Sequence, residues 1–217
     1  MTPSDTKDTA DRIIEAAERL FARHGIARTS LRALTDEAGV NLAAVHYHFG
    51  SKEGLVSAVY GRRVQPLNAE RLRLLDECEA AAGDGPPELE SLLEAFIGPA
   101  LRLRQNRSQG EPFMCLMGRI YSEPARELAP VMAQFDEVRQ RFPAAFQRAL
   151  PELDEVELMW RLHFLLGSLM HTAGGSHLIE RMSHGRCDPA DVEGTIHRLI
   201  SYTGAGLRAS VKETAAP

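Results

Sequence analysis

One short stretch of the chain carries side chains suited to contact nucleic acid. Asn41 is of the type that caps a helix start, and such a start presents free N–H groups and the positive end of the helix dipole to an anionic partner. The next side chains on this helix would enter a DNA major groove, and those near its far end would reach phosphates at the groove edge. We expect Leu42, Ala43 and His46 to meet bases, and Tyr47, His48 and Lys52 to meet phosphates.

Three helices must position these side chains. Apolar residues recur with helical period from Asp8 to His24, and Gly25 follows where a left-handed C-terminal cap is favoured. A serine or threonine then caps a second helix, which Gly39 ends. The third helix is expected over residues 42–49, and a fourth is expected to start near Lys52.

The segment TSLRALTDEAGVNLAAVHYHFGSK, residues 29–52, resembles the helix-turn-helix of the TetR family of bacterial regulators. The likeness extends back through the element A-x-x-L-F-A-x-x-G, which runs from Ala17 to Gly25. It implies a dimer that binds a pseudo-palindromic operator, and repression that a ligand relieves. It also implies that Thr29, Tyr47, His48 and Lys52 contact the DNA backbone. The expected DNA-contacting set is completed by Ser30, Arg32 and Asn41.

The small residues of the turn fit the same interpretation. Ala38 and Gly39 must be small because the second and third helices cross closely there, and Gly39 permits a backbone conformation that a β-carbon opposes. The competing interpretation is that the aromatic residues at 47–49 pack a helical hairpin in a protein that never meets DNA. A metal site is not expected there, because His46 and His48 cannot share one helical face.

Charge is unevenly distributed along the chain. The net charge is −5, yet residues 19–63 carry seven basic and three acidic side chains, a net +4, which leaves −9 for the rest. A basic end attracts phosphate, while an acidic body lowers non-specific binding. The asymmetry therefore favours a nucleic-acid partner, although solvated helix faces often show similar runs.

Composition indicates a globular protein of a reducing compartment. The 44% apolar fraction can fill a core, and Cys78, Cys115 and Cys187 have the spacing of neither a disulfide framework nor a paired metal site. The start MTPSDTKDTADR lacks the apolar run of a signal peptide, and residues 158–173 are too short and too polar to span a membrane. We expect a cytoplasmic protein with no membrane partner.

The expected fold class is all-α, because apolar residues recur with helical period and no segment alternates with period two. We expect a helix-turn-helix DNA-binding domain at 1–52 and a ligand-binding and dimerisation domain at 53–217. Pro66 should interrupt or kink the fourth helix, and Pro143 should kink a later one. After a loop at 80–88, helices are expected over 89–104, 113–122, 130–150 and 154–174, with a last helix that opens at Asp188-Pro189 and continues to about Ser210.

Two apolar helices are expected to form the dimer interface. Residues 158–173 are apolar on both faces, and the last helix combines an apolar stripe with Gly204 and Gly206, which allow close approach. Two such helices from each chain would make a four-helix interface, as the TetR family does. Packing of the same stripes within one chain is the alternative. The expected interface residues are Leu162, Leu166, Leu169, Ile196, Leu199, Ile200, Thr203 and Leu207.

A small hydrophobic effector is expected in the larger domain. The segments FMCLMGRIYSEP, WRLHFLLGSLMHTAGG and NLAAVHYHFGSK look like those of the PsrA-type regulators of fatty-acid metabolism, which implies a long-chain fatty acid or its coenzyme A thioester. Aromatic and Met side chains could line a deformable pocket with a polar group beside it, although such stripes are more often ordinary core. The expected lining is Phe96, Met114, Met117, Tyr121, Phe135, Arg139, Phe142, Trp160, His163 and Phe164.

Two other classes of protein remain as alternatives. The sequence has no nucleophile elbow, phosphate-binding glycine loop or His-Glu-x-x-His motif, so a helical enzyme would need an unrecognised site, and no cofactor is expected. A metal-responsive regulator would use His177, His184 and Cys187, around an expected loop, although their spacing matches no standard site.

Overall fold

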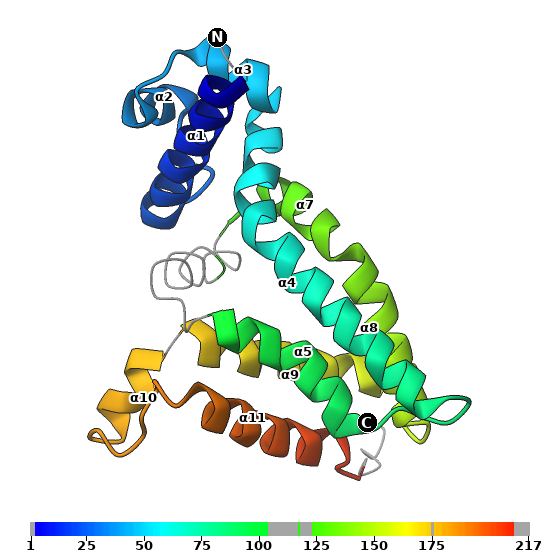
Figure 1. Cartoon of the computed structure of the whole chain (residues 1–217). Helices are drawn as coiled ribbons and strands as arrows, with labels where there is room; N and C mark the ends of the chain where they lie inside the picture. Colours follow the sequence, from blue (N-terminus) through cyan, green and yellow to red (C-terminus); the bar gives the residue numbers. More distant parts are fainter. Residues whose placement is uncertain (1–2, 104–116, 118–122, 175, 211–217) are drawn as a thin grey trace, which may run out of the picture. The chain divides into compact units, whose positions relative to one another are not determined.

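The computed structural model describes residues 3–103, 117, 123–174 and 176–210, and these residues confirm the all-α fold class (Figure 1). None of them lies in a strand. The helices are α1 (Pro3–His24), α2 (Leu31–Ala38), α3 (Leu42–Phe49), α4 (Lys52–Ala82), α5 (Leu89–Arg102), α7 (Ala125–Met132), the 3-10 helix η3 (Ala133–Phe135), α8 (Asp136–Ala149), α9 (Glu155–Gly174), α10 (Ser176–Met182) and α11 (Val192–Leu207).

The contacts between these helices divide the chain into two compact units, each made of two stretches of sequence. The first unit comprises the described residues within Met1–Ala69 and Asn106–Glu137, and the second those within Glu70–Gln105 and Val138–Pro217. Both α4 and α8 contribute residues to the two units. The assignment of DNA binding to residues 1–52 and of ligand binding and dimerisation to 53–217 stays a functional prediction.

Helices α1, α2 and α3 pack around one small apolar core in the first unit. The predicted apolar face of α1 is turned inward because its apolar residues recur every three or four positions. Gly25 follows α1 with φ 85°, and Gly39 ends α2 with φ 63°, so both glycines adopt the left-handed conformation expected of them. The core side chains of these helices are Ile13, Ala16, Ala17, Leu20, Phe21, Leu34, Ala38 and Val45.

The internal prolines do not end their helices. Pro66 lies inside α4, which continues for sixteen residues beyond it, so the predicted interruption does not occur. Pro143 likewise lies inside α8. The helix expected over 130–150 is α7, η3 and α8 in succession. The helix expected over 113–122 lies outside the described residues except for Met117, which is helical.

The last helix begins later than the sequence suggested. Asp188 was expected to cap it, but the Asp188 carboxylate accepts the Ala190 N–H at 2.8 Å in a local turn. Asp191 is the N-cap instead, because its carboxylate accepts the Gly194 N–H at 2.9 Å. Part of the stretch expected as a loop before it forms α10.

In the second unit α5, α9 and α11 pack side by side (Figure 1). Leu92, Leu93 and Ile97 of α5 are fully buried, as are Phe142 and Phe146 of α8. Although α9 is apolar on both sides, no helix in the described part of the chain is both long and apolar enough to cross a membrane.

A buried arginine joins α9 to the end of α11. Arg161 is 8% exposed, and its guanidinium donates to the carbonyls of Gly206 at 3.1 Å, Leu207 at 2.8 Å and Ala209 at 2.7 Å. Its Nε also donates to Glu157 at 2.8 Å. The last carbonyls of a helix have no partner within that helix, so Arg161 satisfies three acceptors at the C-terminal end of α11.

Replacing this arginine should therefore destabilise the second unit. We expect Arg161→Met to lower the free energy of unfolding by about 3 kcal/mol, because it leaves Glu157 and three carbonyls without their charged donor. The matched control is Arg198→Met on α11, whose guanidinium forms an exposed pair with Asp191 and should change stability little. Urea denaturation followed by circular dichroism measures both variants, and an equal effect of the two would contradict this role for Arg161.

Candidate functional site

The recognition helix α3 begins at a side-chain cap, as predicted. Asn41 has extended backbone angles, and its Oδ1 accepts the Ala44 N–H at 2.9 Å. Leu42 and Ala43, the first two residues of the helix, are exposed. α2 begins in the same way, because Ser30 Oγ accepts the Ala33 N–H at 3.1 Å. The helix-turn-helix thus presents two helix starts whose caps are neutral.

The exposed side of α3 carries most of the residues expected to meet DNA. Tyr47 is 75% exposed and Leu42 is 48% exposed, which is unusual for such large side chains. His46 is exposed as well, but its Nδ1 lies 3.0 Å from the Gly50 carbonyl at the end of the helix. His48 is half-buried and meets the Tyr47 ring edge-on at 5.0 Å between centroids. Arg32 is exposed on α2.

Two of the residues expected to contact DNA are engaged within the protein. Thr29 is 4% exposed, and its hydroxyl donates to the Gly25 carbonyl at 2.8 Å. It closes the turn between α1 and α2, and its contact with the DNA backbone stays a prediction. Lys52 donates from Nζ to the Ile26 carbonyl at 2.7 Å. Its ammonium therefore stabilises the same turn.

Two residues that carry no local sequence signal, Arg12 and Glu123, hold this part of the molecule together. Arg12 of α1 donates to the carbonyls of Ala38 at 2.7 Å and Gly39 at 3.2 Å, at the end of α2. The carboxylate of Glu123 accepts the N–H groups of Ile26 at 2.7 Å and Ala27 at 3.2 Å. No local pattern identifies either residue, because their partners are far away in the sequence.

The predicted effector pocket is only partly assembled in the second unit. Phe96 and Phe142 meet edge-on with ring centroids 5.1 Å apart, and Phe142 is buried. The predicted cation beside them, Arg139, is exposed. Arg71 of α4 takes that place: its guanidinium lies 4.5 Å from the centre of the Phe96 ring, and burial lowers the pKa of Arg71 to about 10.

The other predicted lining residues lie elsewhere. Trp160 is 56% exposed and Phe164 is 61% exposed on the outer side of α9, and their rings stack with centroids 5.9 Å apart. His163 is exposed beside them, so these three residues do not line an interior pocket. Met117 and Phe135 belong to the first unit. Met114 and Tyr121 lie outside the described residues.

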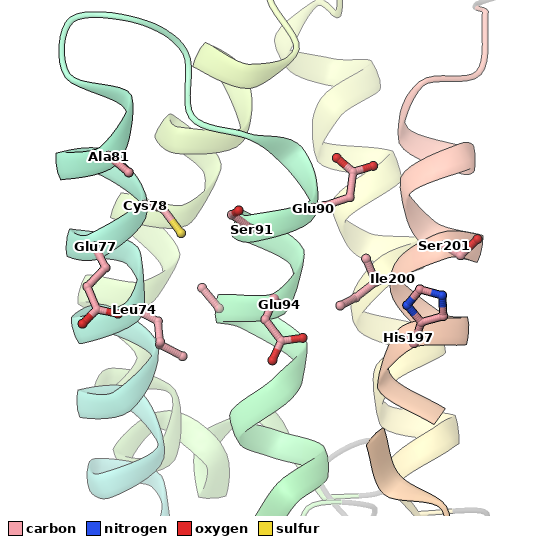
Figure 2. Close-up of a pocket in the computed structure, with 11 residues that line it drawn as sticks. Leu74, Glu77, Cys78, Ala81, Glu90, Ser91, Glu94, His197, Ile200 and Ser201 are labelled. Carbon is pink, nitrogen blue, oxygen red and sulfur yellow. The ribbon is translucent and has the colours of Figure 1, made fainter. Parts of the chain in front are cut away.

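A groove of about 710 Å³ lies on the second unit between α4, α5 and α11, with α5 in the middle (Figure 2). It is in the size range of small-molecule sites. Three carboxylates lie along it and pair with arginines: Glu90 with Arg208, Glu94 with Arg102 and Glu77 with Arg73. The residues that line it are Leu74, Glu77, Cys78, Ala81, Glu90, Ser91, Glu94, Ala95, His197, Ile200 and Ser201.

The chemistry of this groove favours some ligands over others. Burial and the nearby Glu77 carboxylate raise the pKa of the Cys78 thiol, so the thiol stays protonated at neutral pH. Leu74, Ala81 and Ile200 supply apolar surface, and the carboxylates oppose a bound anion. The groove therefore suits an uncharged or positively charged compound better than a carboxylate.

The residues predicted for the dimer interface mostly face the interior of the unit. α11 packs against α5 and α9, which buries its apolar stripe, so the larger part of that prediction is corrected. Leu162 and Ile200 are half-buried, and Leu166 is 41% exposed. The predicted residues that are buried are Leu169, Ile196, Leu199, Thr203 and Leu207, whereas the large side chains that α9 and α11 leave exposed are Val156, Met159, Trp160, Phe164, Leu166 and Tyr202.

The alternative metal site is only partly described. His184, with φ 53°, and Cys187 lie in the turns after α10, whereas the side chain of His177 is outside the described residues. Among the residues that the structure does describe, no three His, Cys, Asp or Glu side chains are grouped to hold a metal ion.

Comparison with protein families gives two matches. Residues 13–59 match the model described as bacterial regulatory proteins, tetR family, and residues 94–206 match the tetracyclin repressor-like C-terminal domain. The second match alone covers more than half of the chain. The first match contains α2, α3 and the start of α4, which are the elements that position the candidate DNA contacts.

Individual relatives agree with these matches. The regulator TtgR of Pseudomonas putida is 43% identical over 58 residues, which are 27% of this chain and 28% of TtgR. Two solved structures have a similar fold. The fatty acid degradation regulator FadR of Bacillus halodurans has a TM-score of 0.60 and 14% identity, and the match covers 97% of this chain and 99% of FadR. A SmeT–triclosan complex has a TM-score of 0.61 and 20% identity, and the match covers 96% of this chain and 99% of SmeT. At these identities the likeness to the solved structures shows the fold alone.

The cap of α3 gives a test of what its start faces. Asn41→Ala should destabilise the first unit by about 1 kcal/mol because the Ala44 N–H loses its acceptor. Asn41→Asp keeps an acceptor, so its stability should stay close to wild type, but its carboxylate should repel phosphate and weaken DNA binding strongly. Asn41→Ser is the matched control, which caps the helix without a charge.

The measurement combines thermal unfolding with titration of duplexes that the wild-type protein has selected from a random pool. If Asn41→Asp binds these duplexes as tightly as Asn41→Ser, the start of α3 does not face DNA.

Proposed function

This chain belongs to the TetR family of DNA-binding transcriptional regulators, and we propose that it is a dimeric repressor that binds a pseudo-palindromic operator and leaves it when a small hydrophobic effector binds. It is a regulator and not an enzyme. The observation that carries the proposal is the start of α3, where the neutral cap of Asn41 is followed by the exposed side chains of Leu42 and Ala43.

The exposed residues of the helix-turn-helix have distinct proposed roles. Leu42 and Ala43 offer apolar contacts of the kind that read thymine methyl groups in the major groove. Tyr47 reaches a phosphate through its hydroxyl, and Arg32 and Ser30 do so from the start of α2. His46 and His48 lie toward the end of α3, where we propose that His46 contacts a base and His48 a phosphate at the edge of the groove.

We propose that α9 provides the main dimer surface through its exposed side, which contains Leu166 of the predicted interface but not the buried Leu169. The exposed rings of Trp160 and Phe164 stack on each other. Val156 and Met159, which precede them on the same helix, are also more than half exposed. A monomer rarely exposes so many large apolar side chains on one helix. A symmetric pairing that covers them would place two reading helices on one operator.

Binding-site selection with the purified protein should therefore recover an inverted repeat. Phe164→Asp should produce a monomer in sedimentation equilibrium and should lose operator affinity on the order of a hundredfold, since the two half-sites are no longer bound together. Trp160 is the only tryptophan of the chain, so its fluorescence should shift to longer wavelength in this variant. The control is Leu178→Asp, an exposed leucine on the next helix, α10, and outside the proposed surface, which should stay dimeric. A dimeric Phe164→Asp would rule out this surface.

For the effector we propose a long-chain fatty acid or its coenzyme A thioester. The proposal is supported by the patchy likeness to the PsrA-type regulators and by the fold shared with a fatty acid degradation regulator. Within the second unit, Arg71 is a cation beside the half-buried Phe96 ring and the buried Phe142 ring, which suits an anionic head with an apolar chain. The groove along Glu77, Glu90 and Glu94 suits such an anion less.

Operator release should depend on acyl chain length. Each buried methylene contributes about 0.8 kcal/mol, so the effective concentration should fall roughly fourfold per carbon until the site is full and then level off. The measurement is operator titration against fatty acids and acyl-coenzyme A thioesters of increasing length, with alkyl amines and planar aromatics alongside.

A variant separates the two candidate sites. Ser91→Trp fills the groove and should leave the acyl response intact, whereas loss of that response would move the effector into the groove. Release by the aromatic compounds alone would overturn the acyl proposal and leave the repressor assignment unchanged.

A further inference from the structure

The turn between α1 and α2 is held by a carboxylate from a much later part of the chain. Both oxygens of Glu123 are used: Oε1 accepts the Ile26 N–H at 2.7 Å and Oε2 accepts the Ala27 N–H at 3.2 Å. Charged acceptors make stronger hydrogen bonds than neutral ones, and two parallel bonds also fix the orientation of the carboxylate relative to the turn. A β-carbon on Gly25 would lie 2.4 Å from Glu123 Oε1, so only glycine leaves room for this contact.

The same turn is also held from α4. Lys52, the first residue of α4, donates from Nζ to the Ile26 carbonyl at 2.7 Å. The peptide groups on either side of Ile26 are therefore bonded to opposite charges, Glu123 at its N–H and Lys52 at its C=O. This turn is the meeting point of α1, α2, α4 and the segment that precedes α7.

Eleven residues beyond Glu123, a second residue holds α4 itself. Gln134 of η3 donates from Nε2 to the Ser57 carbonyl at 2.9 Å, and its own carbonyl accepts the Asn68 side-chain amide at 2.8 Å. A β-carbon on Gly61 would lie 3.1 Å from Gln134 Oε1, which places the Gln134 side chain tightly on α4. The single helix α7 lies between the two contacts along the chain.

We propose that residues 123–135, the brace, fix the orientation of α1–α3 on the first half of α4, and that Glu123 is the positioning residue of this brace. α1–α3 are joined to α4 by the short connection at Gly50-Ser51, by Lys52 on the Ile26 carbonyl and by the pair of Arg63 with Glu18 at 3.9 Å. Glu123 and Gln134 add an attachment from a later part of the chain, which restricts this orientation further. The inference rests on the proposed function, since orientation matters most where two reading helices must match two half-sites.

The brace also offers a route for the effector that does not run along α4. Glu123 and Gln134 lie within residues 94–206, which match the C-terminal family model, whereas Ile26 and Ser57 lie within residues 13–59, which match the N-terminal one. A change that moves Glu123 by little more than a hydrogen-bond length would release the Ile26 and Ala27 N–H groups. Effector binding in the C-terminal part would therefore loosen the reading helices by breaking this contact, while Lys52 still holds the turn from α4.

The test uses Glu123→Ala and Glu123→Gln in the full-length dimer, with Glu127→Gln of α7 as the matched control, because Glu127 pairs only with its neighbour Arg126 among the contacts of the described residues. Amide hydrogen exchange is followed at Ile26 and Ala27, and binding is measured to the selected operator and to a scrambled duplex. For Glu123→Ala we expect exchange at these two amides to accelerate at least tenfold and operator affinity to fall on the order of tenfold, with scrambled-duplex affinity unchanged.

A second variant covers the case in which Glu123→Ala folds poorly. Gln134→Leu opens the other end of the brace, so it should lower operator affinity in the same way, and the double variant with Glu123→Gln should lose less than the product of the two effects. Unchanged operator affinity despite faster exchange, equal losses on both duplexes, or an equal loss for Glu127→Gln would each overturn the brace. If the wild-type protein selects no inverted repeat, the proposed function itself fails.

Discussion

The recognition helix has only eight residues, and a helix of that length is not stable by itself in water. Its geometry must therefore come from its surroundings: Asn41 satisfies its first N–H groups, Val45 anchors it in the core, and the Gly50 N–H returns to the His46 carbonyl at its end. α2 has the same length and the same dependence. DNA recognition thus depends on how firmly α1, α4 and Glu123 fix α2 and α3, which are not stable as isolated helices.

The parts of this arrangement that could be predicted from the sequence are those that act within one helical turn. Asn41, Ser30 and Gly39 were predictable because a cap or a left-handed glycine bonds to groups three or four residues away. Glu123 was not, because its partners are 96 and 97 residues distant and a single glutamate before a proline carries no signal. Thr29 has a structural role that its position in the family pattern did not indicate, since its hydroxyl closes a turn.

The larger helices show a second limit of prediction. α9 is apolar on both sides, so the sequence could not tell which side packs on α5 and α11 and which stays open. Leu165 and Leu169 are turned inward together with Arg161, a charged residue that a hydrophobic pattern assigns to the surface. Its burial is possible only because the end of α11 offers three carbonyls, which are separated from it by more than forty residues. The acids at 188 and 191 were ambiguous for a simpler reason, since either could cap a helix.

Substitutions at Gly25 would have a genetic consequence. Its φ of 85° and the 2.4 Å approach of Glu123 Oε1 to a β-carbon mean that any other residue both strains the turn and displaces the carboxylate. An allele with a side chain at position 25 would therefore be scored as loss of repression although the residue is buried. A collection of such alleles would identify residues that support the recognition helix as readily as residues that contact DNA. Measuring non-specific DNA binding as well would distinguish these two classes of residue.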